Sequence, residues 1–216
     1  MLKTENLEVV GVSHAIRGMR NPMNSWDKSD SFEKDGSFII GENDYKLMKN
    51  LCKAGTDHRK FMRMIVVYVD ITAPLYWWKE FDTYKVGTVC NSCSTMHKIA
   101  DKEFTLEDFS HEHLMCQGEL EICWGDWIPR NVLEHIIRVL NKQRDKYLEY
   151  KSKKFWWQMI QLLPSSYNQK RTIMLNYEVL SNIFHSRKNH KLDEWIYFCD
   201  KIKELPASDL ITGNIE

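Results

Sequence analysis

The feature that most constrains the fold of this chain is a β-branched, apolar run that leads directly into a proline-containing helix start. Residues 61–71 read FMRMIVVYVDI, a composition that favours a buried strand. Thr72-Ala73-Pro74 follows, where the Thr72 hydroxyl can cap free amides and Pro74 falls in the first turn, which needs no N–H from it. The next ten residues, LYWWKEFDTY, then predict a helix. This strand–helix unit indicates mixed α and β structure.

Weaker patterns on either side complete an α+β assignment. Residues 7–12 favour a strand, and the polar, Gly- and Asp-rich stretch 18–41 favours a long loop. Apolar residues at helical spacing predict helices over 43–55, 129–163, 169–187 and 192–205, the second of them with room for a break. Residues 86–95 are rich in small and hydroxyl side chains, which predicts a loop. We expect one domain over residues 1–216.

Composition excludes several classes of function. The chain has 216 residues, 43% of them hydrophobic, which is enough for a substantial core. Thirty basic residues balance thirty acidic ones, so no overall field favours nucleic acid polymers or an anionic membrane. The sequence shows neither a signal-peptide core nor an apolar stretch of about 18 residues. We therefore expect a cytoplasmic protein.

The cysteines do not form a recognisable pattern. In a cytosolic protein we expect all six to be reduced, buried small hydrophobes: Cys52, Cys90, Cys93, Cys116, Cys123 and Cys199. The Cys90-x-x-Cys93 pair has no second half at zinc-site spacing, and His111-x-His113-x-x-Cys116 follows an acidic, surface-like segment. We expect no metal site.

The common phosphate-binding loops, the Walker and GxGxxG motifs, are both absent, so an anion site would have to use helix ends and arginines. In LPSSYNQKR, serines and an asparagine that can cap a helix precede Lys170 and Arg171. This segment suits a simple helix–helix turn and an anion site equally well.

Two aromatic groups have a structural and a functional interpretation. Trp77, Trp78, Trp156 and Trp157 are better explained as core or interface packing than as a platform for a flat ring. A polar-aromatic group around the 18–41 loop suits a solvated loop better than a closure over a ligand. Its members are Arg17, Arg20, Asn21, Asn24, Ser25 and Trp26.

Two ungapped segments resemble one enzyme family. Residues 58–88 read HRKFMRMIVVYVDITAPLYWWKEFDTYKVGT, and residues 162–195 read LLPSSYNQKRTIMLNYEVLSNIFHSRKNHKLDEW. The first is similar to the central strand–helix unit of flavin-dependent thymidylate synthases. The second is similar to that family's Leu-Pro segment, in which an Asn follows the proline by twelve residues and an Arg follows by eleven more, as Asn176 and Arg187 do here.

The resemblance covers about residues 7–195, with an unmatched insertion near 104–130. It implies the family's α+β fold, with a central antiparallel sheet and long helices in a homotetramer whose pockets lie between subunits. It also implies FAD as cofactor and dUMP or a related pyrimidine deoxynucleotide such as dCMP as substrate. Methylene-tetrahydrofolate would supply the carbon, and NADPH the reducing power.

Four residues match functional positions of the family. His58 matches its active-site histidine, and Arg187 matches the arginine that contacts the pyrimidine nucleotide. Asn176 and Asn182 match asparagines near the flavin. The resemblance thus assigns catalytic roles to His58 and Arg187 and cofactor contacts to the two asparagines.

Other functional positions depart from the family, so its flavin motif is degenerate here. The diagnostic Arg-His-Arg reads Thr83-Tyr84-Lys85, and Arg63 replaces a glutamate near the flavin. On the substrate side, Glu80 replaces a glutamine, and the loop that normally carries a Ser and an Arg reads Asn91-Ser92-Cys93-Ser94-Thr95. Thr and Tyr cannot reproduce the bidentate bonds of arginine, so we expect weaker FAD binding, offset in part by Lys85 and Arg63.

These residues leave three readings. The first is a flavin-dependent enzyme that transfers a methyl or hydroxymethyl group to C5 of a pyrimidine deoxynucleotide. The second is a sequestering or regulatory protein that kept the nucleotide pocket and lost the flavin chemistry. The third, with least support, is a structural oligomer that uses its Trp-rich face.

Overall fold

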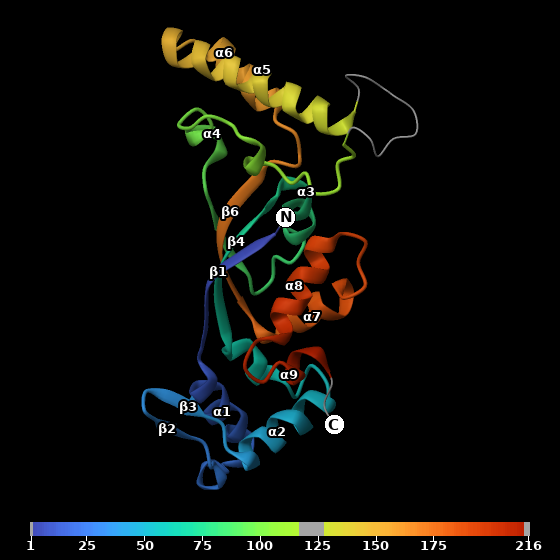
Figure 1. Cartoon of the computed structure of the whole chain (residues 1–216). Helices are drawn as coiled ribbons and strands as arrows, with labels where there is room; N and C mark the ends of the chain where they lie inside the picture. The colour runs from blue at the N-terminus through green and yellow to red at the C-terminus, as the bar shows by residue number, and fades with distance from the viewer. Residues whose placement is uncertain (1, 117–127, 214–216) are drawn as a thin grey trace. The chain divides into compact units, whose positions relative to one another are not determined.

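The structure, a computed structural model, describes residues 2–116 and 128–213 and has an α+β architecture (Figure 1). The described residues form two compact units. Unit 1 lies within Met1–Lys3, Thr72–Phe81 and Ser92–Arg171, and unit 2 lies within Thr4–Ile71, Asp82–Asn91 and Thr172–Glu216. Part of the expected insertion near 104–130, residues 117–127, lies outside the described residues.

A four-stranded antiparallel sheet confirms the expected central sheet. Its strand order is β1 (Lys3–Val10), β4 (Val66–Pro74), β6 (Asn168–Asn176) and β5 (Val89–Ser92). Bonds along β4 and β6 show their direction: Leu75 N donates to Tyr167 O at one end, and Tyr177 N donates to Ile65 O at the other. Later residues of one strand thus face earlier residues of the other, as antiparallel pairing requires.

Unit 2 contains a short β-hairpin and most of the described helices. Its elements are α1 (Val12–Arg20), η1 (Asn21–Met23), η2 (Trp26–Lys28), β2 (Phe32–Lys34), β3 (Ser37–Ile39), α2 (Glu42–Lys53), η3 (Lys60–Met64), α7 (Tyr177–Arg187), α8 (Asp193–Lys203) and α9 (Asp209–Thr212). Helix α7 packs against both α8 and α9. The fully buried side chains of this unit include Met48, Ile71, Ile183 and Trp195.

Gly11 explains why the first strand ends earlier than expected. We predicted a strand over 7–12, whereas β1 ends at Val10 and α1 begins at Val12. Gly11 has φ 88°, and a Cβ there would lie 2.3 Å from the carbonyl oxygen of Met64. Only glycine fits this left-handed, crowded turn.

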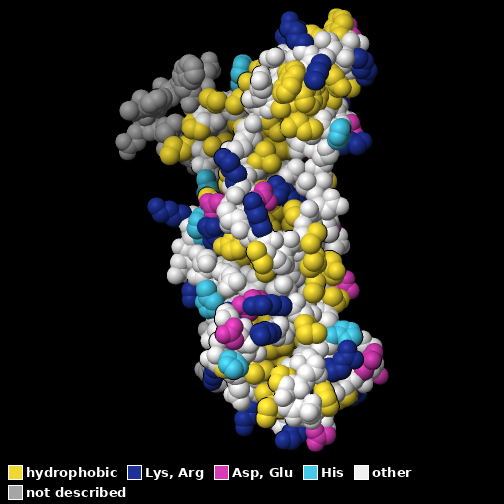
Figure 2. Space-filling view, turned by 180° about the vertical axis from the view of Figure 1, so that it is seen from behind, with side chains coloured by type: hydrophobic (Ala, Val, Ile, Leu, Met, Phe, Trp, Pro, Cys, Tyr) yellow, Lys and Arg dark blue, Asp and Glu magenta, His cyan; other side chains and the backbone are white. Residues whose placement is uncertain are grey.

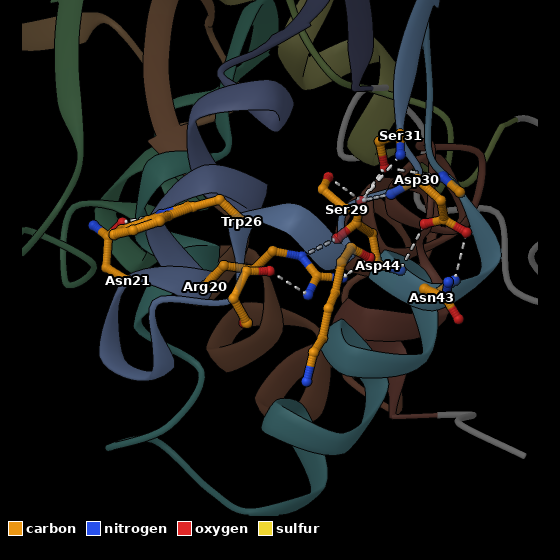
Figure 3. Close-up of polar contacts among 11 residues, drawn as sticks. Arg20, Asn21, Trp26, Ser29, Asp30, Ser31, Asn43 and Asp44 are labelled. Atoms are coloured by element: carbon orange, nitrogen blue, oxygen red, sulfur yellow. Dashed lines mark hydrogen bonds and ion pairs between the residues drawn. The ribbon is translucent and has the colours of Figure 1, made fainter.

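The 18–41 stretch is a structured segment rather than the solvated loop we expected. Figure 3 shows the contacts that fix it around the buried carboxylate of Asp44 on α2. Arg20 Nε donates to Asp44 Oδ1 at 2.6 Å, and the hydroxyls of Ser29 and Ser31 donate to Asp44 Oδ2 at 2.7 and 2.6 Å. Arg20 is 4% exposed, so it is committed to this network and does not face a ligand.

Unit 1 is built on a pair of antiparallel helices. Its elements are α3 (Leu75–Phe81), α4 (Thr95–Lys98), η4 (Leu106–Asp108), α5 (Pro129–Tyr150) and α6 (Lys153–Leu162). Helices α5 and α6 lie side by side (Figure 1). The helix predicted over 129–163 therefore breaks at Lys151, which adopts φ 51° and donates its N–H to Tyr147 O.

The core of unit 1 lies between this helical pair and the segment before it. Phe104, Phe109, Leu133, Leu140 and Met159 belong to one buried cluster. On the outside of the pair, hydrophobic side chains gather beside lysines and arginines at the top of Figure 2. The exposed apolar residues there are Leu148, Tyr150, Trp157 and Leu162. Of the four tryptophans considered above, Trp77 and Trp78 are buried, as core packing predicts.

Two further predictions were wrong in their element type. Residues 169–176 form most of strand β6 instead of the start of a helix, because Ile173 and Leu175 alternate toward the core. Residues 60–64 form a 3-10 helix, and the predicted strand begins only at Val66 and runs through Thr72 to Pro74. Within the described residues, no helix is both long and apolar enough to cross a membrane.

Candidate ligand-binding site

Arg187 is the most firmly positioned of the predicted site residues in unit 2. It ends α7, and its Nε donates to the Tyr84 hydroxyl at 2.9 Å. Its guanidinium carbon lies 4.8 Å from the centre of the Trp195 ring and 5.7 Å from that of Tyr84. The two rings meet edge to face at 6.1 Å. Hydrogen bonding and cation–π attraction thus hold the predicted nucleotide-contacting arginine in one place.

Asn176 caps a helix, the role that the sequence suggested for the serines and the asparagine that precede Lys170. It is the N-cap of α7, where its Oδ1 accepts from Val179 N at 3.1 Å. Its amide nitrogen faces Gly87, where a Cβ would lie 3.0 Å from Nδ2 and where φ is 76°. The Gly87 turn that follows Thr83-Tyr84-Lys85 therefore lies against the start of α7.

The next residue along the chain, Thr88, is unusual in this turn. Its hydroxyl oxygen is buried and has no hydrogen-bond partner among the described residues. A buried hydroxyl without a partner costs free energy, so such a group is a candidate for a ligand or water contact.

His58 lies in an exposed turn whose neighbour is tied to α7. Its N–H donates to Gly55 O at 3.0 Å. The adjacent Arg59 pairs with Glu178: its Nη2 donates to Oε1 at 3.0 Å, and its Nε lies 2.9 Å from Oε2. This ion pair links the turn to the first turn of α7.

The remaining predicted cofactor residues are exposed. They are Arg63 at the end of η3, Thr83 and Lys85 after α3, and Asn182 on α7. Of the predicted site residues, Arg187 and Tyr84 are in direct contact. The cofactor roles of the four exposed residues stay a prediction.

The predicted substrate loop, residues 91–95, lies partly in regular secondary structure. From Ser92 onward it belongs to unit 1. Asn91 and Ser92 end β5, and Thr95 begins α4. Ser94 caps that helix, its Oγ accepting from His97 N at 3.3 Å, and Cys93 N donates to Lys170 O at 3.0 Å. Glu80, predicted to contact substrate, is half-buried on α3.

Two cavities flank this loop and share Cys93, Ser94, Thr95 and Gln169 in their linings. One measures about 390 Å³ and also contains Tyr167, Asn168 and Lys170. The other measures about 410 Å³ and is more apolar, with Leu75, Ile160 and Leu163. In the first cavity the basic residues Lys98 and Lys102 pair with Asp101 and Asp108.

Sequence reasoning missed Trp195 and Gln169, and it considered Arg171 only as part of a possible anion site. Gln169 and Arg171 were assigned to a helix, where residues two apart point in different directions. In strand β6 they share a face, and Arg171 Nε donates to Gln169 Oε1 at 3.0 Å. A strand assignment from the alternating Ile173 and Leu175 would have predicted this pairing.

The cysteines fall into two environments. Cys52 and Cys199 are buried, and burial raises the pKa of each thiol to about 11. The expectation of burial was wrong for Cys90, Cys93 and Cys116, which are exposed, and Cys123 lies outside the described residues. Across residues 2–116 and 128–213, no three His, Cys, Asp or Glu side chains are grouped as metal ligands.

The fold is that of the flavin-dependent thymidylate synthases. Thymidylate synthase X from Helicobacter pylori, solved with FAD and dUMP, superposes with a TM-score of 0.68 at 15% identity over the whole of both chains. A second structure of that enzyme gives 0.67 at 15% identity over 98% of this chain and 100% of the other.

A UMP/dUMP methylase, PolB from Streptomyces cacaoi bound to 5-Br dUMP, shares the fold more distantly. Its TM-score is 0.59 at 12% identity, over 94% of this chain and 88% of the other. No family model matches the sequence, and no curated protein matches it. At these identities the comparison establishes the fold, and the ligands named are those of the solved proteins.

Proposed function

We propose that this protein binds a pyrimidine deoxynucleotide such as dUMP or dCMP and carries out flavin-dependent transfer to its C5 atom. The observation that carries the proposal is the fixed guanidinium of Arg187, at the position that the family resemblance assigns to nucleotide contact. The fold agrees over the full length with an enzyme solved with FAD and dUMP.

Arg187 would contact the nucleotide through its guanidinium, whose Nε also donates to the Tyr84 hydroxyl. A guanidinium stabilises anionic oxygens by charge-assisted hydrogen bonds. Ser94 and Thr95 would add hydroxyl donors from the loop. In the family resemblance such pockets lie between subunits, with Asn91, Ser92, Cys93 and Glu80 as further contacts.

The residues of unit 2 fit a flavin, with fewer cations than the family motif supplies. The buried Thr88 hydroxyl without a recorded partner lies in the motif turn against Asn176, as expected for a turn completed by a ligand. Lys85 and Arg63 would hold the diphosphate, and Asn176, Asn182, Thr83 and Tyr84 would line the site. A bound reduced flavin supplies carbon and hydride transfer, whereas His58 and Arg187 orient the rings and stabilise charge.

The position of Tyr84 favours a second candidate, a nucleotide-binding protein without flavin chemistry. Tyr84 stands where the family has histidine, and its hydroxyl accepts from Arg187. It therefore serves the nucleotide-contacting arginine. Of the family's three cationic motif residues, only Lys85 remains a permanent cation here.

We further propose a homo-oligomer, a homotetramer by the resemblance. Leu148, Tyr150, Trp157 and Leu162 are exposed apolar side chains on α5 and α6, and hydrophobic side chains gather at the top of Figure 2. Apolar side chains that gather on a surface mark an interaction site. Light scattering at micromolar concentration tests this, and a monomer would contradict it.

Calorimetric titration of dUMP and dCMP into the purified protein tests the function itself. The proposal expects saturable binding of at least one of them. The absorption spectrum of the purified protein and a titration with FAD then separate the candidates. If a nucleotide binds and FAD does not bind under any condition, the result selects the nucleotide-binding protein over the enzyme.

A further inference from the structure

The side-chain amide of Gln169 has only one chemically consistent orientation. Its Oε1 and Nε2 differ in role, since the oxygen accepts and the nitrogen donates. Arg171 Nε lies 3.0 Å from Oε1 and, like every arginine nitrogen, can only donate. The amide oxygen must therefore face Arg171, and the amide nitrogen must face the other way.

Arg171 is itself fixed by a buried ring. Its guanidinium carbon lies 4.2 Å from the centre of the Trp78 ring, which is 1% exposed. Trp78 Nε1 also donates to the backbone oxygen of Gln169 at 2.9 Å. The orientation of the Gln169 amide is thus anchored in the core of unit 1.

The nitrogen of the Gln169 amide faces the loop and determines which loop oxygens accept hydrogen bonds. Gln169 Nε2 donates to Cys93 O at 2.9 Å and to Thr95 Oγ1 at 3.2 Å. Because the Thr95 oxygen accepts this bond, its own hydrogen must point elsewhere. Among the described residues, no acceptor for that hydrogen is recorded, and Thr95 lines the cavity of about 390 Å³.

We propose that Gln169 holds the Thr95 hydroxyl as a hydrogen-bond donor toward this cavity, so that the loop selects an acceptor oxygen of the ligand, either a phosphate or a carbonyl oxygen. This rests on the proposed binding of a pyrimidine nucleotide. Two of the lysines that line this cavity, Lys98 and Lys102, pair with Asp101 and Asp108. Gln169 is a positioning residue, and Thr95 is the group that touches the ligand.

A reversal of hydrogen-bond direction tests the proposal. Gln169→Glu turns the donor into an acceptor, so the Thr95 hydroxyl then donates to Glu and presents only lone pairs to the ligand. Thr95→Val removes the hydroxyl. Each change should weaken dUMP binding roughly tenfold, as expected for one lost hydrogen bond to a charged oxygen. Thr95→Ser should restore binding, and Gln158→Glu on exposed α6 is the control of equal charge.

The double variant separates direction from charge, because an added carboxylate also repels phosphate. If Gln169 acts through Thr95, Gln169→Glu costs less in the Thr95→Val background than in the wild type, because only the charge repulsion then remains. Additive losses, or an unchanged Thr95→Val, would overturn the proposal. A parallel series with uncharged deoxyuridine identifies the oxygen: a loss for both ligands selects a carbonyl, and a loss for dUMP alone selects the phosphate.

Amide hydrogen exchange distinguishes a failed inference from a failed function. Gln169→Ala should increase exchange of the Cys93 amide, which bonds to Lys170 O, whether or not a ligand is present. Unchanged exchange would show that Gln169 does not brace the loop. If wild type binds neither dUMP nor deoxyuridine, the proposed function and the ligand role of Thr95 are both overturned. The exchange result would still show whether Gln169 stabilises the loop.

Discussion

The guanidinium carbon of Arg187 lies 4.8 Å from the centre of the Trp195 ring, a residue that is fully buried in unit 2. Together with the 2.9 Å bond to Tyr84, this contact holds the arginine before any ligand arrives. A preorganised guanidinium loses less conformational entropy on binding than a mobile one. The pair would therefore preorganise Arg187 for the nucleotide contact proposed above.

Arg187→Ala should weaken dUMP binding by roughly ten- to hundredfold, the effect of one charge-assisted hydrogen bond. Calorimetric titration measures this directly. Lys188→Ala, which removes the next and exposed cation, is the matched control and should bind like wild type. Equal affinity for wild type and Arg187→Ala would remove Arg187 from the site.

Tyr84→Phe tests the positioning of Arg187 without removing its charge. The variant keeps the ring and loses the hydroxyl, so one hydrogen bond from a charged donor, worth about 1.5 to 3 kcal/mol, is lost. We expect dUMP binding to weaken by a few-fold and the free energy of unfolding in urea to fall by no more than the value of that bond. An affinity equal to that of wild type would mean that the Tyr84 hydroxyl does not position the arginine.

Asp44→Asn should destabilise the fold, because it leaves the buried Arg20 without its counter-ion. The loss of one partner from a buried pair costs about 3 to 5 kcal/mol. Urea unfolding at neutral pH measures it, and Asp27→Asn at an exposed position is the control. A loss below about 1 kcal/mol would show that the network in Figure 3 does not stabilise the 18–41 segment.

The same carboxylate predicts a pH dependence. Burial alone raises the pKa of Asp44, but hydrogen bonds from Ser31, Ser29 and Arg20 outweigh burial and hold the pKa below its ordinary value of 3.8. A depressed folded-state pKa stabilises the fold fully above the unfolded value, and this is lost as the pH falls through the folded pKa. The stability gap between wild type and Asp44→Asn should therefore shrink only below about pH 4.

Thiol alkylation of the native protein should label Cys90, Cys93 and Cys116 before Cys52 and Cys199. The first three are exposed, and burial raises the pKa of the other two to about 11, which suppresses their thiolates. Peptide mass spectrometry after brief treatment reads out each site. Denatured protein, in which all sites react, is the control, and early labelling of Cys52 would contradict its buried position.

The sequence predicted the α+β class and helices close to α2 and α8 from their apolar periodicity, and it predicted the central sheet through the family resemblance. It failed over 169–176, where alternating Ile173 and Leu175 were read at helical spacing, a known ambiguity of short apolar runs. The assignment of Arg187 to the site rests on residue identity within the family resemblance and stays a prediction. The contacts of Trp195 and Gln169 could not be predicted, because they depend on chain segments distant in sequence.

Variants in the flavin motif separate effects on FAD binding from effects on dUMP binding. Thr83 is exposed, so Thr83→Arg adds a guanidinium where the family has one, and FAD should bind roughly ten- to hundredfold more tightly. Tyr84→His also restores the family residue but removes the hydroxyl that holds Arg187, so it should weaken dUMP binding. Titrations of FAD with and without dUMP, on both single variants, measure the two effects. Thr83→Lys is the control for charge without the planar fork, and it should recover only part of the gain. If Thr83→Arg leaves FAD binding unchanged while Tyr84→His weakens dUMP binding, the turn of residues 83–88 serves the nucleotide and not a flavin.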